Sequence, residues 1–168
     1  MNCVIYLVRH GIAAPAAAGM SDADRPLTPA GERKVVRIAR GLKRLGVEPD
    51  AVVSSPLPRA ADTARLLMAG LAPGVEVELD SVLSPGSAAS AAMQVMTAYR
   101  GARQLMLVGH EPGMGELASQ LLTGSATLAS LPFKKGGVAA IRVGALPPRA
   151  PGMLLWLLTP KQLRLIGR

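Results

Sequence analysis

The two histidines of this 168-residue sequence occupy similar positions along the chain. His10 and His110 each follow an apolar stretch typical of a buried strand, and each precedes a segment with helical periodicity. Imidazole is a nucleophile and a proton carrier near neutral pH. A lone histidine is more often structural than catalytic, but two histidines at strand ends, with no third in the chain, favour a shared functional site.

Two arginines have positions that call for an anionic partner. Arg9 ends a stretch that should be buried, where a guanidinium needs a counter-charge or an exit to solvent. Arg59 falls in the first turn of an expected helix, which is unfavourable against the helix dipole unless an anion lies there; taken alone, it is more often a surface residue. A bound phosphoryl group would satisfy both. We therefore predict a phosphate site built from Arg9, His10, Arg59 and His110.

Alternating strands and helices must position these residues. The expected strands are Cys3 to Val8, Ala51 to Ser54, Val75 to Leu79, Gln104 to Val108, Val138 to Val143 and Met153 to Leu158. The expected helices run from Thr28 as N-cap to Gly46, from Pro58 towards Met68, from Ala88 to Tyr99 and from Pro112 to Leu122.

This order predicts an α/β fold, a three-layer sandwich with a mostly parallel central sheet flanked by helices. The last two strands, joined by the proline-rich segment Leu146 to Gly152, could add an antiparallel edge. Ligands of such sheets bind beyond the carboxyl ends of the strands. Both histidines are therefore expected at the ligand-binding edge.

Composition limits the remaining possibilities. With 168 residues, of which 49% are apolar, we expect one domain over residues 1–168 with a sizeable core. No apolar run approaches the length of a membrane span, and the first run is too short for a signal peptide, so we expect a cytoplasmic protein with no membrane partner. Cys3 has no disulfide partner and is expected to be a small buried side chain. Two histidines and one cysteine offer no metal-ligand spacing, so no metal and no cofactor are expected.

A net charge of +8 suggests anionic partners, among which nucleic acid must be considered. Only four aromatic residues are present, which is poor material for base stacking, and the basic residues look scattered along the sequence. We therefore expect no nucleic-acid partner. Alternatively, the chain is rich in Arg, Ala, Gly and Pro because of the base composition of its genome, and the excess charge has no functional meaning.

Four motifs, in this order along the chain, are similar to those of the histidine phosphatase superfamily. They are Arg9-His10-Gly11, Arg25-Pro26-Leu27-Thr28 with Gly31, Ser54-Ser55-Pro56 with Arg59-Ala60 and Thr63-Ala64, and Gly109-His110-Glu111-Pro112. Small size and the lack of an inserted cap domain make the chain most similar to the SixA-type phosphohistidine phosphatases. The resemblance covers residues 1 to about 122 and includes the closing segment Trp156 to Pro160. It implies a phosphoglycerate-mutase-like fold.

The resemblance also implies roles for these positions. His10 would be the nucleophile and would become phosphohistidine, which water then hydrolyses. Arg9, Arg59 and His110 would bind the phosphoryl oxygens and stabilise the transition state. Arg25 would add a further contact, although it is equally well explained as a surface residue.

Three further residues have smaller expected roles. Thr28 fits a helix cap better than a ligand, because Pro29 follows it at the first helical position. Ser55 and the backbone of Gly11 are expected to shape the pocket without taking part in catalysis.

The sequence departs from the larger members of the superfamily at the proton donor. Asp80 and Glu111 are the candidates, and each is more often a solvated or structural acid. A phosphohistidine substrate tolerates this gap, since imidazole leaves far more readily than an alkoxide. Ile12 is a second departure, because small members often have a carboxylate there.

These observations favour a phosphatase that removes phosphate from phosphohistidine of a protein. A phosphomonoesterase acting on a small phosphate ester is the alternative, and a non-catalytic phosphate-binding module is a third reading. The glycine-containing segment Gly124 to Gly137, with Lys134 and Lys135, either touches the substrate or is merely exposed; exposure is slightly favoured.

Overall fold

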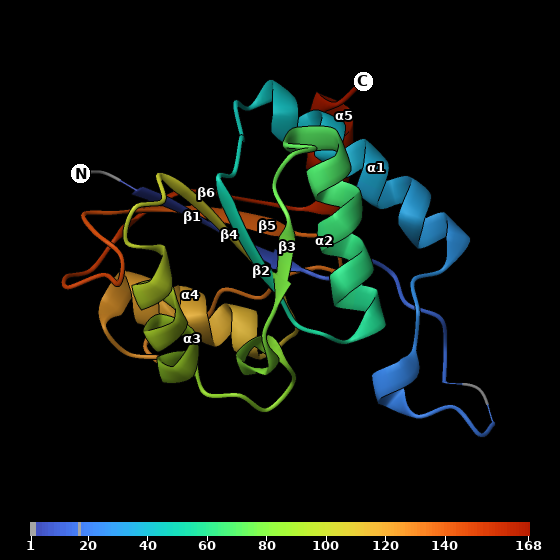
Figure 1. Ribbon diagram of the computed structural model, residues 1–168, viewed down its shortest axis with the longest axis horizontal. Coiled ribbons are helices and arrows are strands. Elements are labelled where there is room, and N and C mark those ends of the chain that lie inside the picture. The colour runs from blue at the N-terminus through green and yellow to red at the C-terminus, as the bar shows by residue number, and fades with distance from the viewer. Residues whose placement is uncertain (1–2, 17) are drawn as a thin grey trace.

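The computed structural model describes residues 3–16 and 18–168 of the chain. Within these residues six strands form one sheet in the order β3-β2-β4-β1-β5-β6 (Figure 1). The strands are β1 (Cys3–Arg9), β2 (Ala51–Ser54), β3 (Val77–Leu79), β4 (Gln104–Gly109), β5 (Val138–Val143) and β6 (Met153–Leu158). The pairs β1–β4, β2–β4 and β2–β3 are parallel, whereas β1–β5 and β5–β6 are antiparallel. The expected mostly parallel sheet with an antiparallel edge is confirmed.

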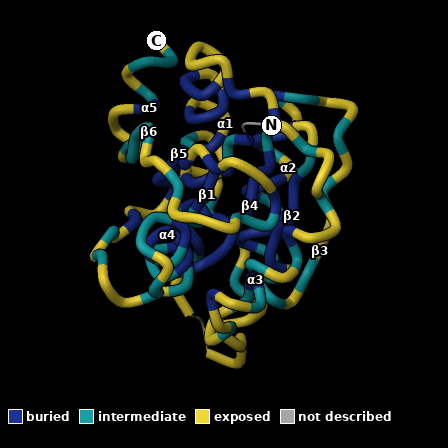
Figure 2. The backbone as a smooth tube through the Cα atoms, turned by 90° about the vertical axis from the view of Figure 1, so that its left-hand side faces the viewer, coloured by how far each residue is buried: buried dark blue, intermediate teal, exposed yellow. Residues whose placement is uncertain are grey.

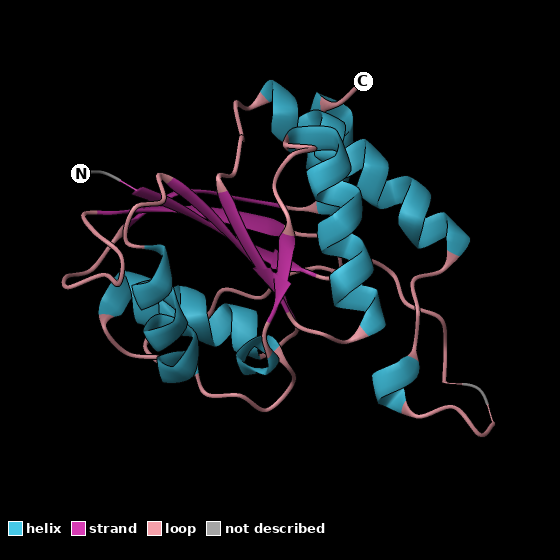
Figure 3. Cartoon of the chain, viewed as in Figure 1, coloured by secondary structure: helices cyan, strands magenta, loops and turns pink. Residues whose placement is uncertain are grey.

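Helices cover both faces of this sheet (Figure 3). They are α1 (Pro29–Arg44), α2 (Pro58–Leu71), α3 (Ala89–Val95), α4 (Gly113–Thr123) and α5 (Pro160–Ile166). One face carries α1, α2 and α5, and the other carries α3 and α4. Successive side chains of β1 alternate between the two layers: Ile5 and Leu7 pack towards α3 and α4, and Tyr6 and Val8 towards α1 and α2.

Burial of both sheet faces explains why the central strands have continuous apolar runs. In Figure 2 the inner strands β1, β2, β4 and β5 are mostly dark blue, whereas the edge strands β3 and β6 are intermediate or exposed. Cys3 is buried, as expected from the sequence. No helix of the described residues is long and apolar enough to cross a bilayer.

The helix α5 was not predicted. Thr159 caps it by accepting a hydrogen bond from Gln162 N, and the Gln162 side chain accepts from Thr159 N in return, forming a capping box with Pro160 at the first position. α5 packs on α1 at Gly41, where a Cβ atom would lie 2.0 Å from the carbonyl oxygen of Leu163. Only glycine permits this close approach of the two backbones.

Two elements differ from the sequence-based expectation in length. β3 begins at Val77 rather than Val75, and the expected helix from Ala88 to Tyr99 is α3 followed by a 3₁₀ turn, Met96–Tyr99. Both segments lie towards the edges of the fold, where tertiary contacts specify less of the local geometry. The other predicted elements agree with the structure to within a few residues.

Candidate active site

A cavity of about 290 Å³ lies beyond the carboxyl ends of the parallel strands. Its lining residues come from six separate parts of the chain. They are Arg9, His10, Asp22, Arg25, Arg59, Pro85, His110, Glu111 and Lys135. The structure therefore brings together the four residues predicted to form a phosphate site, and with them Arg25 and Glu111.

Strand pairing alone brings the two histidines together. β1 and β4 are parallel neighbours with Arg9 opposite Gly109, so the next residue of each strand, His10 and His110, leaves the sheet at the same place. The backbone N–H of His10 donates to the carbonyl oxygen of Gly109 at 3.0 Å. The two imidazole rings have centroids 4.9 Å apart.

The hydrogen bond of His10 determines which ring nitrogen carries the proton. Nδ1 lies 2.7 Å from the carbonyl oxygen of Gly11, which can only accept, so Nδ1 is protonated and Nε2 keeps its lone pair. Gly11 is itself held in place, because its N–H donates to Thr63 Oγ1 at 3.0 Å, and that hydroxyl donates to the carbonyl oxygen of Arg59. His10 is thus oriented with a free Nε2.

Burial keeps both imidazoles neutral. Desolvation, together with the nearby Arg59 and Arg9 guanidinium groups, lowers the pKa of His10 to about 4. Desolvation, together with His10 and Arg59, lowers the pKa of His110 to about 3. At neutral pH His10 therefore has the uncharged form that a nucleophile requires.

His110 is fixed from one side only. Its Nε2 lies 2.9 Å from Ser55 Oγ, and this hydroxyl also accepts from the backbone N–H of Leu57 at 3.3 Å. In the tautomer in which the Ser55 hydroxyl donates to Nε2, the ring proton sits on Nδ1 and is available to a ligand; in the other tautomer Nε2 donates to Ser55 and Nδ1 is an acceptor. Ser55 thus contacts the site through His110 and does not itself line the cavity.

Arg59 lies in the first turn of α2 with only 4% of its surface exposed. Its guanidinium donates to the carbonyl oxygen of Asp22 at 2.6 Å and pairs with the Asp22 carboxylate at 3.0 Å. Arg25 holds the other oxygen of the same carboxylate at 2.6 Å and donates from Nε to the carbonyl oxygen of Ala14. Hydrogen bonding to Arg25, and then the charge of Arg59, lower the pKa of Asp22.

Two buried polar atoms in the cavity lack hydrogen-bond partners. Arg9 donates from Nη1 to the carbonyl oxygen of Phe133 at 2.6 Å, but its Nε has no partner. His110 Nδ1 also has none. Among the described residues, no other buried side-chain nitrogen or oxygen atom lacks a hydrogen-bond partner. Both atoms belong to residues that line the same cavity. Buried donors of this kind are costly unless a ligand or water satisfies them.

The two candidate proton donors lie in different places. Glu111 lines the cavity, but its oxygens accept from the backbone N–H groups of Phe133 and Gly115, so the carboxylate anchors the segment before β5. Asp80 does not line the cavity. Its carboxylate accepts from Val82 N at 3.0 Å and caps the 3₁₀ turn Ser81–Leu83.

Asp22 and Lys135 line the cavity in addition to the residues predicted for the site. Asp22 was not predicted, although it stands three residues before Arg25 of the Arg25-Pro26 motif, which was the available signal. Lys135 is exposed, as favoured from the sequence, and it also lines the cavity. The following residue, Gly136, donates its N–H to the carbonyl oxygens of Arg9 and His10.

Charge and donor chemistry suit a compact anion. Four cationic side chains, those of Arg9, Arg25, Arg59 and Lys135, line the cavity with the carboxylates of Asp22 and Glu111. Within residues 3–16 and 18–168 no group of three His, Cys, Asp or Glu side chains gathers to hold a metal ion. Thr28 lies beside the site as the cap of α1, accepting from Gly31 N at 2.9 Å.

Comparison with known proteins identifies the family of the chain. Residues 5–84 match the model of the histidine phosphatase superfamily (branch 1). An uncharacterized protein of Picosynechococcus is 35% identical over 163 residues, covering 95% of this chain and 98% of that protein. The chain belongs to the histidine phosphatase superfamily.

Solved structures place the chain with the small SixA type. The protein histidine phosphatase SixA complexed with tungstate superposes with a TM-score of 0.84 at 26% identity, covering 95% of this chain and 99% of that one. A putative SixA from Agrobacterium tumefaciens gives 0.76 at 25% identity, with 94% and 98% covered. A putative alpha-ribazole-5'-P phosphatase from Escherichia coli, at 17% identity and a TM-score of 0.75 over 94% and 97% of the two chains, shares the fold.

Proposed function

We propose that this phosphatase removes the phosphoryl group from phosphohistidine of a protein, with His10 as the nucleophile. The observation that carries the proposal is the convergence of two neutral imidazoles and two arginines, Arg9 and Arg59, on one cavity of about 290 Å³. The cavity has room for a phosphoryl group and the ring that carries it. No metal or cofactor takes part in the proposed reaction.

In the first step His10 Nε2 attacks phosphorus in line with the leaving nitrogen. A new N–P bond forms on His10 while the N–P bond of the substrate breaks, and the departing imidazole takes its proton from solvent. The carbonyl oxygen of Gly11 accepts from Nδ1 and stabilises the positive charge that develops on the ring. Water then attacks the phosphohistidine and releases phosphate.

Charge on the transferring group is stabilised by donors already in place. Arg9 and His110 each offer a buried donor with no partner in the described structure, and Arg59 offers its guanidinium. Donors fixed in advance contribute most to phosphoryl transfer, because they need no reorganisation during the reaction. Arg59 must share its guanidinium between the phosphoryl oxygens and Asp22.

The carboxylates favour an N-linked phosphate. Asp22 has a lowered pKa and stays ionised at neutral pH, and the Glu111 oxygens accept from two backbone N–H groups. Neither arrangement suits a proton donor. An imidazole leaving group needs none, since it is easily protonated, whereas an alkoxide leaves poorly without one. The likeness to the protein histidine phosphatase SixA supports the same substrate class.

A small phosphate ester is the second candidate substrate. The observation in its favour is the Asp22 carboxylate, which lines the cavity and would be the proton donor if a bound ester displaced it from Arg59. Rates on phosphoimidazole and on an aryl phosphate, compared at equal enzyme concentration, separate the two candidates. We expect phosphoimidazole to react faster, and a large preference for the ester would reverse the choice.

The nucleophile is tested by His10→Ala. Loss of the covalent step should lower turnover of a histidine-phosphorylated protein by about 10⁴-fold or more. Brief reaction of the wild-type chain with labelled substrate should leave an acid-labile, base-stable phosphate on His10, detected by peptide mapping. Circular dichroism of the variant checks that the fold is retained. Unchanged turnover in a folded His10→Ala variant would refute the mechanism. Phosphate binding without any turnover by the wild-type chain would instead favour the non-catalytic phosphate-binding module.

A further inference from the structure

The net charge of the chain is concentrated in two segments. α1 and residues 160–168 together hold nine of the 19 basic residues and one of the 11 acidic residues, Glu32. The rest of the chain holds ten basic and ten acidic residues, so its charges balance. The whole excess of +8 therefore resides on α1 and the C-terminal segment. The expectation that the basic residues are scattered is therefore wrong, because much of the positive charge gathers on these two segments.

The fold joins these two segments into one surface. α5 lies on α1 through the contact at Gly41, and the guanidinium of Arg44 donates to the carbonyl oxygens of Ile166 and Arg168 at 2.8 and 2.9 Å. Two hollows of about 550 and 590 Å³ open along the junction. Glu32 also lines the second hollow. We call the cationic lining of the two hollows the α1–α5 basic face: Arg33, Lys34, Arg37, Arg40, Lys161, Arg164 and Arg168.

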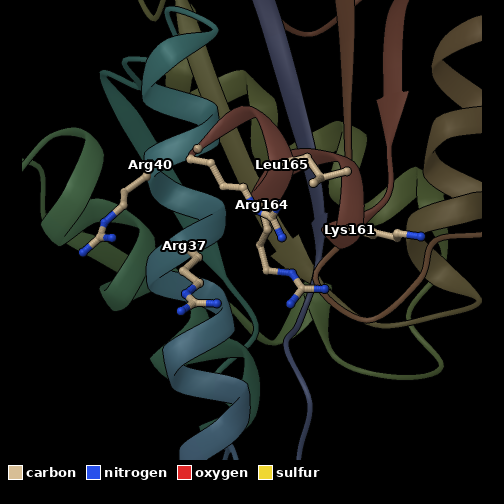
Figure 4. Close-up of a pocket in the computed structure, with 7 residues that line it drawn as sticks. Arg37, Arg40, Lys161, Arg164 and Leu165 are labelled. Carbon is tan, nitrogen blue, oxygen red and sulfur yellow. The ribbon is translucent and has the colours of Figure 1, made fainter.

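These side chains have no acidic partners. Figure 4 shows Arg37 on α1 and Arg164 on α5 extending their guanidinium groups towards the same side of the two helices. Within residues 3–16 and 18–168, no ion pair involves a residue of the basic face. Clustered arginines without internal counter-ions produce a positive potential that attracts an acidic partner.

The segment before β5 packs on the two helices that carry the basic face and also lines the catalytic cavity. Gly136, whose N–H donates to Arg9 and His10, packs against both helices: a Cβ there would lie 2.9 Å from Ile38 Cδ1 of α1 and 3.6 Å from Pro160 Cβ of α5. Lys135, the preceding residue, lines the cavity itself. Lys135 and Gly136 thus link the cavity to α1 and α5 through the same short segment.

We propose that the α1–α5 basic face docks an acidic surface of the phosphorylated protein whose phosphohistidine enters the cavity. This inference rests on the proposed function. A cavity of about 290 Å³ encloses little beyond the phosphoryl group and its ring, so recognition of a particular protein must come from outside the cavity. Charge complementarity on a large open face speeds association and selects partners.

Nucleic acid and anionic membranes would also be attracted by this charge, but neither presents a phosphohistidine to His10. An acidic protein that carries a phosphohistidine would engage both the charge of the basic face and the chemistry of the cavity, and this favours it over the other two. The face then acts on the encounter, through kcat/KM, and leaves the chemical step unchanged.

The test compares a small substrate with a protein substrate. Arg37→Glu/Arg40→Glu reverses two charges on exposed side chains that have no hydrogen bond in the structure. We expect kcat/KM for an acidic, histidine-phosphorylated protein domain to fall by about 10-fold or more, through KM. Turnover of phosphoimidazole, which reaches only the cavity, should change by less than about 2-fold.

A matched control has the same change of net charge elsewhere. Arg100→Glu/Arg103→Glu alters exposed residues at the start of β4, the opposite end of the strand from the cavity, and should leave both substrates unaffected. The wild-type rate on the protein domain should also fall steeply between 50 and 500 mM salt, and this dependence should weaken in Arg37→Glu/Arg40→Glu.

The outcomes distinguish failure of the proposed function from failure of the docking inference. If wild type fails on phosphoimidazole and on the phosphoprotein, the proposed function is wrong, and the docking inference with it. If both react but Arg37→Glu/Arg40→Glu keeps the wild-type kcat/KM on the phosphoprotein, the docking inference alone is overturned. Loss of plasmid DNA or anionic vesicle binding in that variant, with full phosphoprotein turnover, would assign the face to one of those partners instead.

Discussion

The catalytic cavity and the α1–α5 basic face are both rich in arginine, yet they differ in exposure to water. In the cavity Arg59 is only 4% exposed, and the histidines are 6% and 4% exposed. On the basic face Arg33, Arg37, Arg40, Lys161 and Arg168 are exposed. The cavity uses few groups at fixed distances, whereas the face uses many groups without fixed partners.

Solvent access determines what each set of charges can do. In the cavity, burial of the imidazoles, together with the nearby guanidinium groups, lowers the histidine pKa values, and the buried Arg59 guanidinium can stabilise a transferring phosphoryl group. On the basic face, each charge is weakened by water and by salt, with a screening length of about 8 Å at physiological ionic strength. The cavity is therefore suited to catalysis and the face to attraction.

Removing one arginine from each region should test this difference most strongly. Arg59→Ala should lower kcat/KM for phosphoimidazole by about 10²- to 10³-fold, because it removes a fixed donor to the phosphoryl oxygens. Its melting temperature should change little, since the Asp22 carboxylate left behind is exposed and no charge is left buried without a partner. Arg40→Ala should leave both quantities unchanged within error.

Steady-state kinetics and thermal unfolding of the two variants provide the measurement. A large loss of stability in Arg59→Ala would mean that the pair with Asp22 holds the fold together. A kinetic effect of Arg40→Ala on the small substrate would mean that the face and the cavity are not separate.

The pH dependence of folding stability should also distinguish the cavity, which contains both histidines, from the basic face, which contains none. The expected effect is smaller than the kinetic effect of Arg59→Ala. Both histidines have a folded pKa below the ordinary value of 6.5 because of burial. The unfolded chain therefore binds protons below about pH 6.5 that the folded chain refuses until about pH 4 or below, and folding stability falls as pH decreases through this window. Between pH 7 and 5 we expect a loss of about 1 to 2 kcal/mol for each histidine.

Urea unfolding of the wild type and of His10→Asn/His110→Asn at the two pH values isolates this contribution. The carboxylates titrate in both proteins, so the difference between the proteins belongs to the histidines. Equal pH dependence would contradict neutral, desolvated imidazoles. Arg37→Glu/Arg40→Glu, which removes no histidine, should retain the wild-type difference.

Much of the site could be predicted because it follows from strand order. An apolar run ending in Arg9-His10 and another ending in Gly109-His110 predict parallel neighbours, and the register of Arg9 with Gly109 then fixes the histidines side by side. Arg59 at the start of a helix belongs to the same edge. These placements depend on local patterns and on one topological rule.

The remaining features depend on contacts that no local pattern contains. Asp22 reaches Arg59 across 37 positions of sequence, from a loop whose path is set by Arg25 and Ala14. Predicting the basic face would have required predicting α5. This short helix was missed, although Thr159 and Gln162 carry its capping signal. Composition gave the net charge, but only the packing of α5 on α1 shows where that charge accumulates.

Asp22 is exposed to solvent and also lines the cavity. Of the substitutions considered, that of Asp22 should have the smallest effect. Asp22→Asn removes the negative charge that competes with phosphate for Arg59 and Arg25. We therefore expect orthovanadate to inhibit about 2- to 5-fold more tightly, with phosphoimidazole turnover within about 3-fold of wild type. Selective loss of aryl phosphate turnover would instead identify Asp22 as a proton donor. Weaker vanadate binding would mean that Asp22 orients Arg59 for the phosphoryl group, in which case even the rim of the cavity is preorganised.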